Sequence, residues 1–536
     1  MGNWTTTSRR HLGAWYTPDD VVGGLLDLAF EPVLADRRTD GVDAVAALRV
    51  LDPSCGDGAF LLAAGFRIHR ILVDLGVEDR RARRTAFGRC VVGVDVDPEA
   101  VDACRRRLAE AGAEDPSDRV VEADALLASD DDWSALLAAW EAPSGVDAVL
   151  GNPPFLNPLA DDTSAGPERA AALRARFGDA ARGYANPASL FLVLAGRLAA
   201  RRGSVVSLVQ PLSLLATRGA AVTRSTILDS WGLEALWVAG EHVFDAAVDV
   251  CAPLFRPYSP ARGTRTRLVV GRDFDDLGTA HSPGPDDVTW SDLLATVRSV
   301  PDVALCTGGV LGDVAAASAD FRDQYYGLAG HLVDAEFGDA TTPRLLTAAL
   351  VDPAHDRWGE ASTLVLKASW THPRVRLDGL SVGMRQWADA RLVPKVMVAS
   401  QTRVLEAVVD DDGACLPSVP LVSMVPVDGS PVDVWGIAAV LTSPPAAMVA
   451  ARRHLGAALS SDALKLGARD MAALPLPAKH GPWVEAARAF RAASTATDPG
   501  TRHTNLLACG HSMCAAYGVR DAEHLLSWWE GRLPDR

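Results

Sequence analysis

Lysine, paired cysteines and long apolar runs are scarce or missing in this chain of 536 residues. Only four residues are lysine, so arginine supplies nearly all of the positive charge of a chain whose net charge is −16. No apolar run approaches the roughly 18 residues of a membrane span, and no apolar core follows a basic stretch at the N-terminus, as a signal peptide requires. We therefore expect a folded cytoplasmic protein of more than one domain, with no membrane partner.

The eight cysteines are scattered and form no paired framework, which predicts reduced thiols. Their one cluster is Cys-Gly-His-Ser-Met-Cys at residues 509–514. A metal site needs about four ligands, and the tail offers no second half of such a site. We interpret the cluster as small residues on a packed helix and expect no metal.

The acidic balance argues only weakly against a nucleic acid partner, because binding depends on where the positive charges lie. Between Lys367 and Arg403, seven basic residues stand against two acidic ones. Such a basic island can bind a phosphate backbone. The alternative interpretation of this stretch is a solvated surface with its tryptophans in the core. The residues expected to contact nucleic acid are Arg374, Arg376, Arg385, Arg391, Lys395 and Arg403.

Short apolar runs alternate with helical patterns up to about residue 260, which predicts an α/β fold with a mostly parallel sheet and helices on both faces. Strands are expected near residues 48–51, 90–94, 120–121, 147–150, 204–209 and 236–238, and helices near 59–73, 98–111 and 190–200. Later, breaker-rich segments and short strands predict a mixed α+β domain, followed by a helical tail. The expected domains are residues 1–265, 266–480 and 481–536.

The turn Asp52-Pro53-Ser54-Cys55-Gly56-Asp57-Gly58 joins the first expected strand to the first helix. Its two glycines permit a tight turn and a close approach of a ligand to the backbone amides. It lacks the third glycine of a dinucleotide fingerprint, and no Gly-Lys-Ser/Thr follows as in a phosphate loop. Because the turn is acidic, it suits a cationic, amino-acid-bearing nucleotide, and S-adenosylmethionine meets that requirement.

Two further carboxylates follow strands. Asp95 ends the second strand, where a carboxylate accepts hydrogen bonds from both ribose hydroxyls. Asp124 follows the third strand, where it can accept a hydrogen bond from the adenine amino group of the cofactor. Asp97 precedes Pro98 and is expected to cap the second helix. The alternative for Asp95 and Asp124 is an acidic loop in solvent.

Asn152-Pro153-Pro154-Phe155 follows a buried strand. Two prolines in series fix φ and remove two backbone donors, so the carbonyl oxygens there stay free to accept. An amide side chain, a rigid carbonyl and an aromatic face together suit the binding of a planar group with an exocyclic amine. The four residues are therefore the candidate catalytic set.

The order of these motifs resembles that of the amino-methylating DNA methyltransferases, and most closely the adenine-N6 enzymes of the gamma arrangement, whose catalytic half precedes the target-recognition domain. Residues 12–22, with Tyr16 and Thr17, resemble the family segment at the methionine end of the cofactor. Residues 242–244 resemble the stretch whose phenylalanine, here Phe244, packs on the target base. The resemblance implies a seven-stranded Rossmann-like sheet. The expected S-adenosylmethionine contacts are Tyr16, Thr17, Asp52, Pro53, Cys55, Gly56, Gly58, Asp95, Asp124 and Asn152.

The chain also departs from the family. Asp95 stands where the family often has glutamate, and Ala125 replaces an aromatic residue beside the adenine ring, which implies weaker cofactor binding. Residues 157–187, with Arg169, have no counterpart that we can map. That segment is expected either to hold DNA or to be a solvated helix.

The resemblance implies methyl transfer to N6 of an adenine flipped out of double-stranded DNA, with Phe155 and Phe244 stacked on the base. The Asn152 side chain and the Pro153 carbonyl would accept hydrogen bonds from the two N–H groups of the adenine amine. The alternatives are an RNA or protein-glutamine methyltransferase with the same grip, and a non-catalytic DNA-binding subunit. We expect no fused nuclease, so that restriction or phage defence would need a partner protein.

Overall fold

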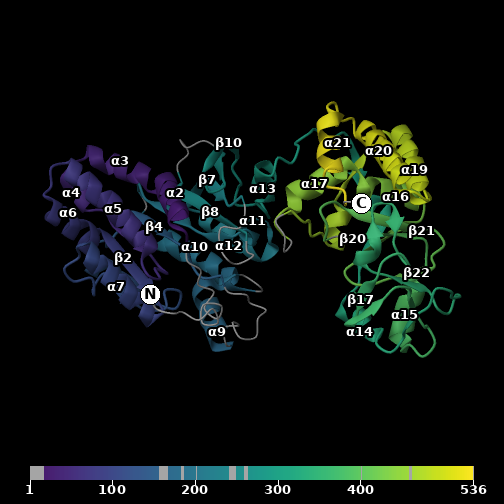
Figure 1. Ribbon diagram of the computed structural model, residues 1–536, viewed down its shortest axis with the longest axis horizontal. Helices are drawn as coiled ribbons and strands as arrows, with labels where there is room; N and C mark the ends of the chain where they lie inside the picture. The colour runs from purple at the N-terminus through teal and green to yellow at the C-terminus, as the bar shows by residue number, and fades with distance from the viewer. Residues whose placement is uncertain are drawn as a thin grey trace. The chain divides into compact units, whose positions relative to one another are not determined.

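The computed structural model describes residues 17–155, 167–182, 186–200, 202–240, 249–258, 264–399, 401–457 and 462–534. The chain divides into two compact units, Met1–Val297 (unit 1) and Arg298–Arg536 (unit 2), which Figure 1 shows in purple to teal and in green to yellow. The unit boundary lies later than the domain boundary expected at residue 265, because two strands and a helix that follow it belong to unit 1. The functions of these units stay predictions.

Among the described residues of unit 1, the strands form one ten-stranded sheet. Its strands are β1 (Val50–Asp52), β2 (Val91–Asp95), β3 (Val120–Glu122), β4 (Ala148–Gly151), β5 (Val205–Leu208), β6 (Gln210–Pro211), β7 (Trp231–Val238), β8 (Val250–Pro257), β9 (Arg265–Val270) and β10 (Asp275–His281). The order is β10-β9-β7-β8-β5-β4-β1-β2-β3, and β6 pairs with β8. From β3 to β5 every pairing is parallel, and β8 is antiparallel to both of its main neighbours. The run from β3 to β7 supplies the seven expected strands, which β9, β10 and the short β6 extend.

The described helices of unit 1 comprise three that precede the first strand and others that lie between or after the strands. They are α2 (Asp19–Ala29), α3 (Glu31–Thr39), α4 (Val42–Ala46), α5 (Ala59–Asp74), α6 (Asp79–Thr85), α7 (Pro98–Ala111), α8 (Asp130–Ala139), α9 (Pro167–Phe177), α10 (Pro187–Leu198), α11 (Ser213–Ala216), α12 (Ala221–Leu228) and α13 (Ser291–Val297). The expected cap is confirmed: the Asp97 side chain accepts the Glu99 amide, and Pro98 is the first residue of α7. A proline there loses nothing, since that N–H has no partner inside a helix.

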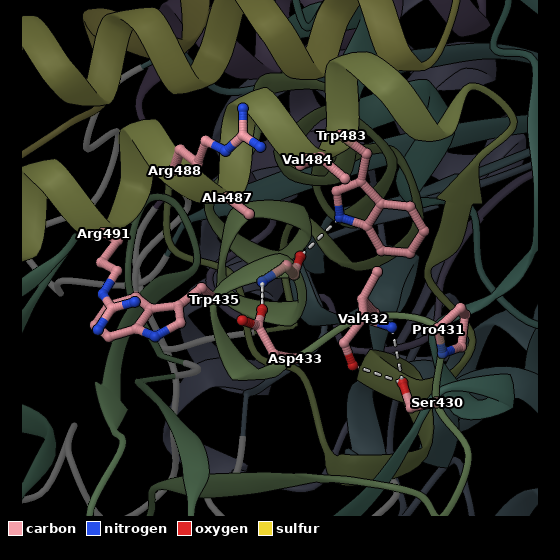
Figure 2. Close-up of a pocket in the computed structure, with 11 residues that line it drawn as sticks. Ser430, Pro431, Val432, Asp433, Trp435, Trp483, Val484, Ala487, Arg488 and Arg491 are labelled. Atoms are coloured by element: carbon pink, nitrogen blue, oxygen red, sulfur yellow. Dashed lines mark hydrogen bonds between the residues drawn. The ribbon is translucent and has the colours of Figure 1, made fainter.

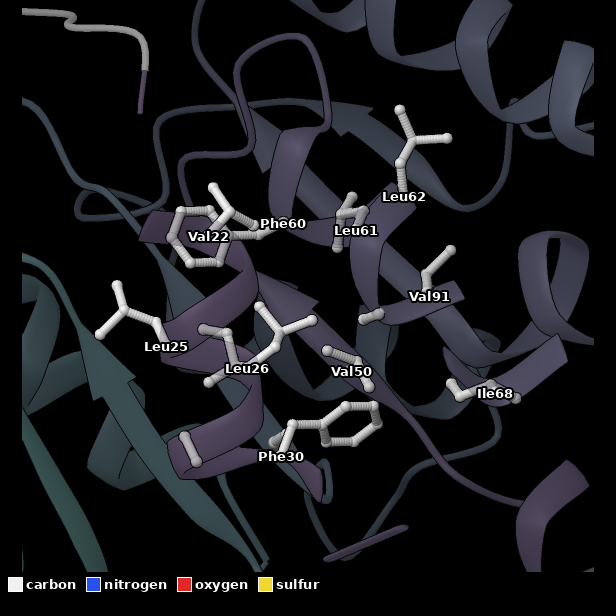
Figure 3. Packing of buried hydrophobic residues seen from close by; sticks show 14 of the residues in the cluster. Val22, Leu25, Leu26, Phe30, Val50, Phe60, Leu61, Leu62, Ile68 and Val91 are labelled. Carbon is white, nitrogen blue, oxygen red and sulfur yellow. The ribbon is translucent and has the colours of Figure 1, made fainter. Parts of the chain in front are cut away.

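The core of unit 1 lies between α2, α5 and the first strands. Figure 3 shows Leu26 and Phe30 of the α2 segment facing Val50 of β1 and Phe60 of α5. The buried positions of α2 recur at helical spacing, so that one stripe of the helix is apolar. This packing holds the N-terminal segment, which begins at Thr17 in the described part, against the strands that carry the motifs.

Unit 2 contains several small sheets instead of one large sheet. Its strands are β11 (Thr307–Val310), β12 (Ala315–Ala319), β13 (Leu332–Asp334), β14 (Arg344–Leu346), β15 (Val351–Asp352), β16 (His355–Asp356), β17 (Thr363–Val365), β18 (Ala368–Trp370), β19 (Pro373–Val375), β20 (Lys395–Ala399), β21 (Glu406–Asp410), β22 (Cys415–Pro417), β23 (Val422–Pro426) and β24 (Pro475–Pro477). Two four-stranded sheets have the orders β12-β23-β20-β21 and β13-β19-β14-β22. This arrangement confirms the mixed α+β fold that the loss of alternation predicts.

The helices of unit 2 lie mostly near the C-terminus. They are α14 (Arg322–Gly327), α15 (Val382–Arg391), α16 (Val434–Thr442), α17 (Pro444–His454), α18 (Ala468–Ala472), α19 (His480–Ser494), α20 (Pro499–Ala516) and α21 (Ala522–Glu530). Figure 1 shows α19 to α21 gathered beside α16 and α17, so the predicted helical tail is confirmed. Within the described ranges, no single helix is long and apolar enough to cross a membrane. The bent pair α16 and α17 has sufficient length and apolarity, but it is largely buried in unit 2.

The cysteine cluster lies on α20. Cys509 and Cys514 are buried, and burial raises the pKa of both thiols to about 12, so both stay protonated near neutral pH. His511 is exposed. The interpretation as a packed helix is therefore confirmed.

Candidate active site

The motif residues of unit 1 meet because the strands that carry them are parallel neighbours. Asp52 ends β1, Asp95 ends β2, and Asn152 directly follows β4. Strand β1 pairs in parallel with both β2 and β4, and β2 pairs in parallel with β3, which precedes Asp124. Carboxyl ends of parallel strands share one edge of a sheet, the usual position of ligands in such folds. The sheet thus brings together four of the predicted side chains.

Asp52 is the most deeply buried acidic group of this edge. Its side chain accepts the Ser54 amide at 3.0 Å and lies against Gly151, where a Cβ atom would stand 2.3 Å from Oδ1. Burial raises the pKa of Asp52 to about 8, although the Ser54 hydrogen bond opposes the shift. The close approach explains why residue 151 is glycine, and it places Asp52 beside the backbone that leads to Asn152.

The glycine turn is bound to the second strand through Asp95. The Gly56 amide donates to Asp95 Oδ2 at 2.8 Å, and the Asp97 amide donates to Oδ1 at 3.0 Å. Each oxygen has a second lone pair for a further donor. Burial raises the pKa of Asp95 in spite of these bonds.

Both glycines of the turn have positive φ angles, +52° at Gly56 and +88° at Gly58. A Cβ atom at Gly58 would also lie 2.6 Å from Cys104 Sγ, whereas one at Gly56 would meet nothing within 4 Å. Gly58 is therefore required for packing. Gly56 is required for the turn and borders open space, as a ligand-binding backbone would.

Asp124 is half-buried and already has several donors. Its Oδ1 accepts the Leu126 and Leu127 amides at 3.1 and 3.3 Å, and its Oδ2 forms an ion pair with Arg169 of α9. The expectation for residues 157–187 did not include this contact. Nothing in the sequence around Arg169 distinguishes it from the other arginines of that helix.

Asn152 is joined to the N-terminal segment. Its Nδ2 donates to Thr17 Oγ1 at 3.0 Å, and Thr17 is buried. Because the amide group is planar, this bond turns the carbonyl oxygen to the other side of the side chain. Pro153 is buried, and Phe155 is half-buried against the unit 1 core. Pro53 and Cys55 are buried in the turn. Tyr16 and Phe244 lie outside the described residues.

The basic island of unit 2 is largely bound to the protein itself. Lys395 is fully buried in β20 and pairs with Asp410, so its prediction as a DNA contact is wrong. Arg374 donates to three backbone carbonyls, and Arg391 pairs at 2.7 Å with the buried Asp320. These two arginines stabilise unit 2, and we withdraw them as DNA contacts. A count of charges along irregular strands does not distinguish inward from outward side chains.

Three residues of the island keep exposed charges. Arg376 is exposed and donates to the Gly330 carbonyl, Arg385 pairs at the surface with Asp389, and Arg403 donates to the Gly531 carbonyl. They remain available to a phosphate backbone.

Unit 2 also has a cavity of about 480 Å³ between α16 and α19. Figure 2 shows Arg491 beside Trp435, 5.2 Å from the ring centroid, and Trp483 donating to the Gly436 carbonyl. None of the predicted site residues lines it. We assign no role in the site to this cavity.

Comparison with known proteins agrees with the geometry of unit 1. Residues 1–253 match the sequence model of the N-6 DNA methylase family. This part of the chain is similar to N-6 DNA methylases. The match ends within β8, so the matched residues include the strand-end carboxylates and Asn152.

Two curated methyltransferases are similar to part of this chain. The Type II methyltransferase M.BstVI of Geobacillus stearothermophilus is 30% identical over 164 residues, which are 28% of this chain and 26% of that protein. The Type II methyltransferase M.BanIII of Aneurinibacillus aneurinilyticus is 28% identical over 155 residues, which are 28% of this chain and 23% of that protein. The chain thus matches about a quarter of the length of these relatives.

A solved structure extends the likeness of fold beyond residues 1–253. The Type IIL restriction-modification enzyme MmeI, solved in complex with DNA, matches with a TM-score of 0.63 and 12% identity. The match covers 99% of this chain and 80% of MmeI. At this identity the likeness concerns the fold alone.

Proposed function

We propose that this protein is a site-specific DNA methyltransferase that transfers a methyl group to N6 of a flipped adenine. The observation that carries the proposal is the shared sheet edge of Asp52, Asp95 and Asn152 within a domain of the N-6 DNA methylase family. The family match disfavours the alternatives of an RNA or a protein-glutamine substrate. Intact acidic groups and Asn152 disfavour a non-catalytic subunit.

The residues at the sheet edge fit S-adenosylmethionine. The open space at Gly56 permits an approach to the turn, and both Asp95 oxygens have lone pairs for ribose hydroxyls. The carboxylate of Asp52 would be favoured in its ionised form by a cation. When bound, the cofactor supplies an electrophilic methyl group on a sulfonium centre. The cofactor contacts at Thr17, Pro53, Cys55 and Gly58 stay part of this proposal, as does Tyr16.

The chain's own part in the reaction is to bind and orient the target amine. The amino nitrogen of adenine is a poor nucleophile because its lone pair is delocalised into the ring. The two N–H groups of the amine would donate hydrogen bonds to the Asn152 oxygen and the Pro153 carbonyl. These bonds would favour a tetrahedral nitrogen with a free lone pair. Positioning then supplies much of the rate enhancement. Pro154 stiffens the turn, and Phe155, with Phe244, would stack on the base, each at about 1–3 kcal/mol.

Unit 2 is proposed as the target-recognition part, with double-stranded DNA as the partner. Its exposed candidates for phosphate contact are Arg376, Arg385 and Arg403. Type II methyltransferases and a restriction-modification enzyme are among the similar proteins, which favours a role in restriction-modification or phage defence. A separate nuclease would then be a further partner. The cytoplasmic location stays a prediction.

Asn152→Ala tests the proposed chemistry. We expect methyl transfer to fall on the order of 10²–10³-fold, the usual effect of removing one oriented hydrogen-bonding group from an active site. The dissociation constant of S-adenosylhomocysteine should rise far less than this, because Asn152 is only one of ten expected cofactor contacts. The control is Asn186→Ala, which removes the asparagine that caps α10 through the Ala188 amide.

The measurement is the map of N6-methyladenine in DNA from cells that express the wild type, either variant or neither. The wild type and Asn186→Ala should methylate the same sites, and Asn152→Ala should not. Wild-type methylation by Asn152→Ala would refute the assignment of the active site. An absence of N6-methyladenine in all cells would direct the search to RNA or protein substrates.

A further inference from the structure

The ion pair between Arg169 and Asp124 concerns the same carboxylate that the proposed function assigns to the adenine amino group of the cofactor. Arg169 lies at the start of α9, and its Nη1 donates to Asp124 Oδ2. The two side chains are 34% and 21% exposed, so the pair is partly shielded from water. Partly shielded pairs are less weakened by salt than fully exposed ones.

The two oxygens of Asp124 are not equivalent. Oδ1 accepts two backbone amides, those of Leu126 and Leu127. A carboxylate oxygen has two lone pairs, so Oδ1 has no capacity left for a further donor. Oδ2 is the oxygen that can receive an amino group, and Arg169 already fills one of its two lone pairs and neutralises its charge.

The rest of α9 is attached independently of Arg169. Leu173 and Phe177 are buried, and the Arg197 guanidinium lies 5.1 Å from the centroid of the Phe177 ring. Arg176 pairs with Asp130, at the start of α8, at 3.2 Å. A change in the rotamer of Arg169 alone would therefore release Asp124 while α9 stays in place.

We propose that Arg169 competes with the adenine amino group of the cofactor for Oδ2 of Asp124, and so sets the affinity of the site for S-adenosylmethionine. This inference rests on the proposed function, which gives Asp124 its role. Cofactor binding exchanges a salt bridge for a hydrogen bond, and the displaced guanidinium, being one-third exposed, is hydrated at little cost. The apparent affinity is then the intrinsic affinity multiplied by the fraction of molecules in which Asp124 is released.

Arg169→Met tests the competition, because methionine keeps the length and apolar stem of the side chain but has no charge. At low salt the dissociation constant of S-adenosylhomocysteine, measured by calorimetry, should fall about two- to fivefold, the range that partly exposed ion pairs provide. The ratio of the wild-type to the variant constant should move toward one as salt is raised, because salt still weakens a pair that is partly exposed. The matched control is Arg174→Met, an exposed arginine of the same helix, which should bind like the wild type.

Asp124→Asn separates the failure of this inference from that of the proposed function. It should weaken binding of S-adenosylhomocysteine, and Arg169→Met should then have no further effect in the Asp124→Asn background. If Asp124→Asn leaves binding unchanged, Asp124 is not a cofactor contact, and the proposed site is wrong at this residue. If Asp124→Asn weakens binding but Arg169→Met does not strengthen it, only the competition is refuted.

Discussion

The two units of this protein place their charged side chains in different ways. In unit 1, Asp52 and Asp95 stand at the ends of neighbouring parallel strands, bound mainly by backbone amides of adjacent loops. In unit 2, Lys395 and Arg391 belong to elements of a mixed domain and are paired with buried aspartates. The carboxyl groups of unit 1 therefore face the proposed site, whereas these basic groups of unit 2 face the protein.

This difference shows what a sequence motif needs in order to predict a site. A residue at the end of a strand in a parallel α/β sheet comes to the carboxyl edge whatever its neighbours are. No such rule predicts the direction of a basic side chain in a region of short strands, because a shift of one residue in register turns the side chain to the opposite face. Motif position is thus informative in unit 1, and charge count is a poor guide in unit 2.

The sharpest way to break the comparison is Lys395→Met. If Lys395 is structural, the change leaves Asp410 buried without its cationic partner, and the free energy of unfolding should fall by about 3–5 kcal/mol. The DNA affinity of the folded fraction should not change. Urea denaturation and DNA titration measure the two quantities.

Arg376→Met is the matched control for Lys395→Met, since Arg376 is exposed in the same basic island. It should leave unfolding within about 0.5 kcal/mol of the wild type. It should also reduce the slope of log K against log salt for DNA binding by about 0.9 if it contacts one phosphate. A loss of DNA affinity without a loss of stability in Lys395→Met would reverse the roles that we assign.

Gly151→Ala tests the close packing at the edge of unit 1. The new methyl group would stand 2.3 Å from Asp52 Oδ1, so either Asp52 or the start of the Asn152 turn must move. We expect unfolding to become easier by about 1–3 kcal/mol, as overpacking of a core typically does. Methyl transfer should fall together with stability. Thermal unfolding and a methyl-transfer assay are the measurements.

The control for Gly151→Ala is Gly23→Ala in α2, where nothing lies within 4 Å of the added Cβ. A helical glycine replaced by alanine should stabilise the protein, by up to about 1 kcal/mol. Equal effects of the two substitutions would show that Asp52 does not constrain residue 151.

The pH dependence of the free energy of unfolding tests one buried carboxyl group in each unit. Burial raises the pKa of Asp52 in unit 1 and of Glu406 in unit 2 to about 8. Above the ordinary carboxyl pKa and below about pH 8, the folded chain keeps protons at these groups that the unfolded chain has lost. The free energy of unfolding therefore falls as pH rises, by up to about 1.4 kcal/mol per pH unit for each group, and the fall ends above about pH 8.

Asp52→Asn and Glu406→Gln should each remove the contribution of one carboxyl group to this decrease in the free energy of unfolding. Urea denaturation between about pH 5 and pH 8 measures it. S-adenosylmethionine, being cationic, should favour ionised Asp52 and reduce only the part due to that residue. An equal effect of the cofactor on the part due to Glu406 would contradict the placement of Asp52 in the cofactor site.

Much of unit 1 was predictable from local patterns. The expected helix at residues 98–111 is α7, and the strands expected near 48–51 and 147–150 are β1 and β4. Alternation of strand and helix has a strong signal because each element carries its own periodicity and its own end signals. The extension of the sheet by β9 and β10 lacked such a signal, since those strands lie between two breaker-rich segments.

The contacts that join distant parts of the chain were not predictable in the same way. The hydrogen bond from Asn152 to Thr17 spans 135 positions, and the pair of Arg169 with Asp124 spans 45. No property of Arg169 marks it among the arginines of its helix. Likewise, the burial of Lys395 depends on its face of β20, which only the packing of neighbouring strands decides.

The sequence by itself determined which chemical groups stand at the ends of which strands, because the order of motifs and the parallel sheet follow from local periodicity. Only the tertiary structure decided which of those groups are engaged. It bound Asp124 to Arg169, pressed Asp52 against Gly151, and turned Lys395 toward Asp410. The physical reason is that burial and pairing are properties of three-dimensional neighbours, and the free energy of a charge depends on those neighbours more than on its place in the chain.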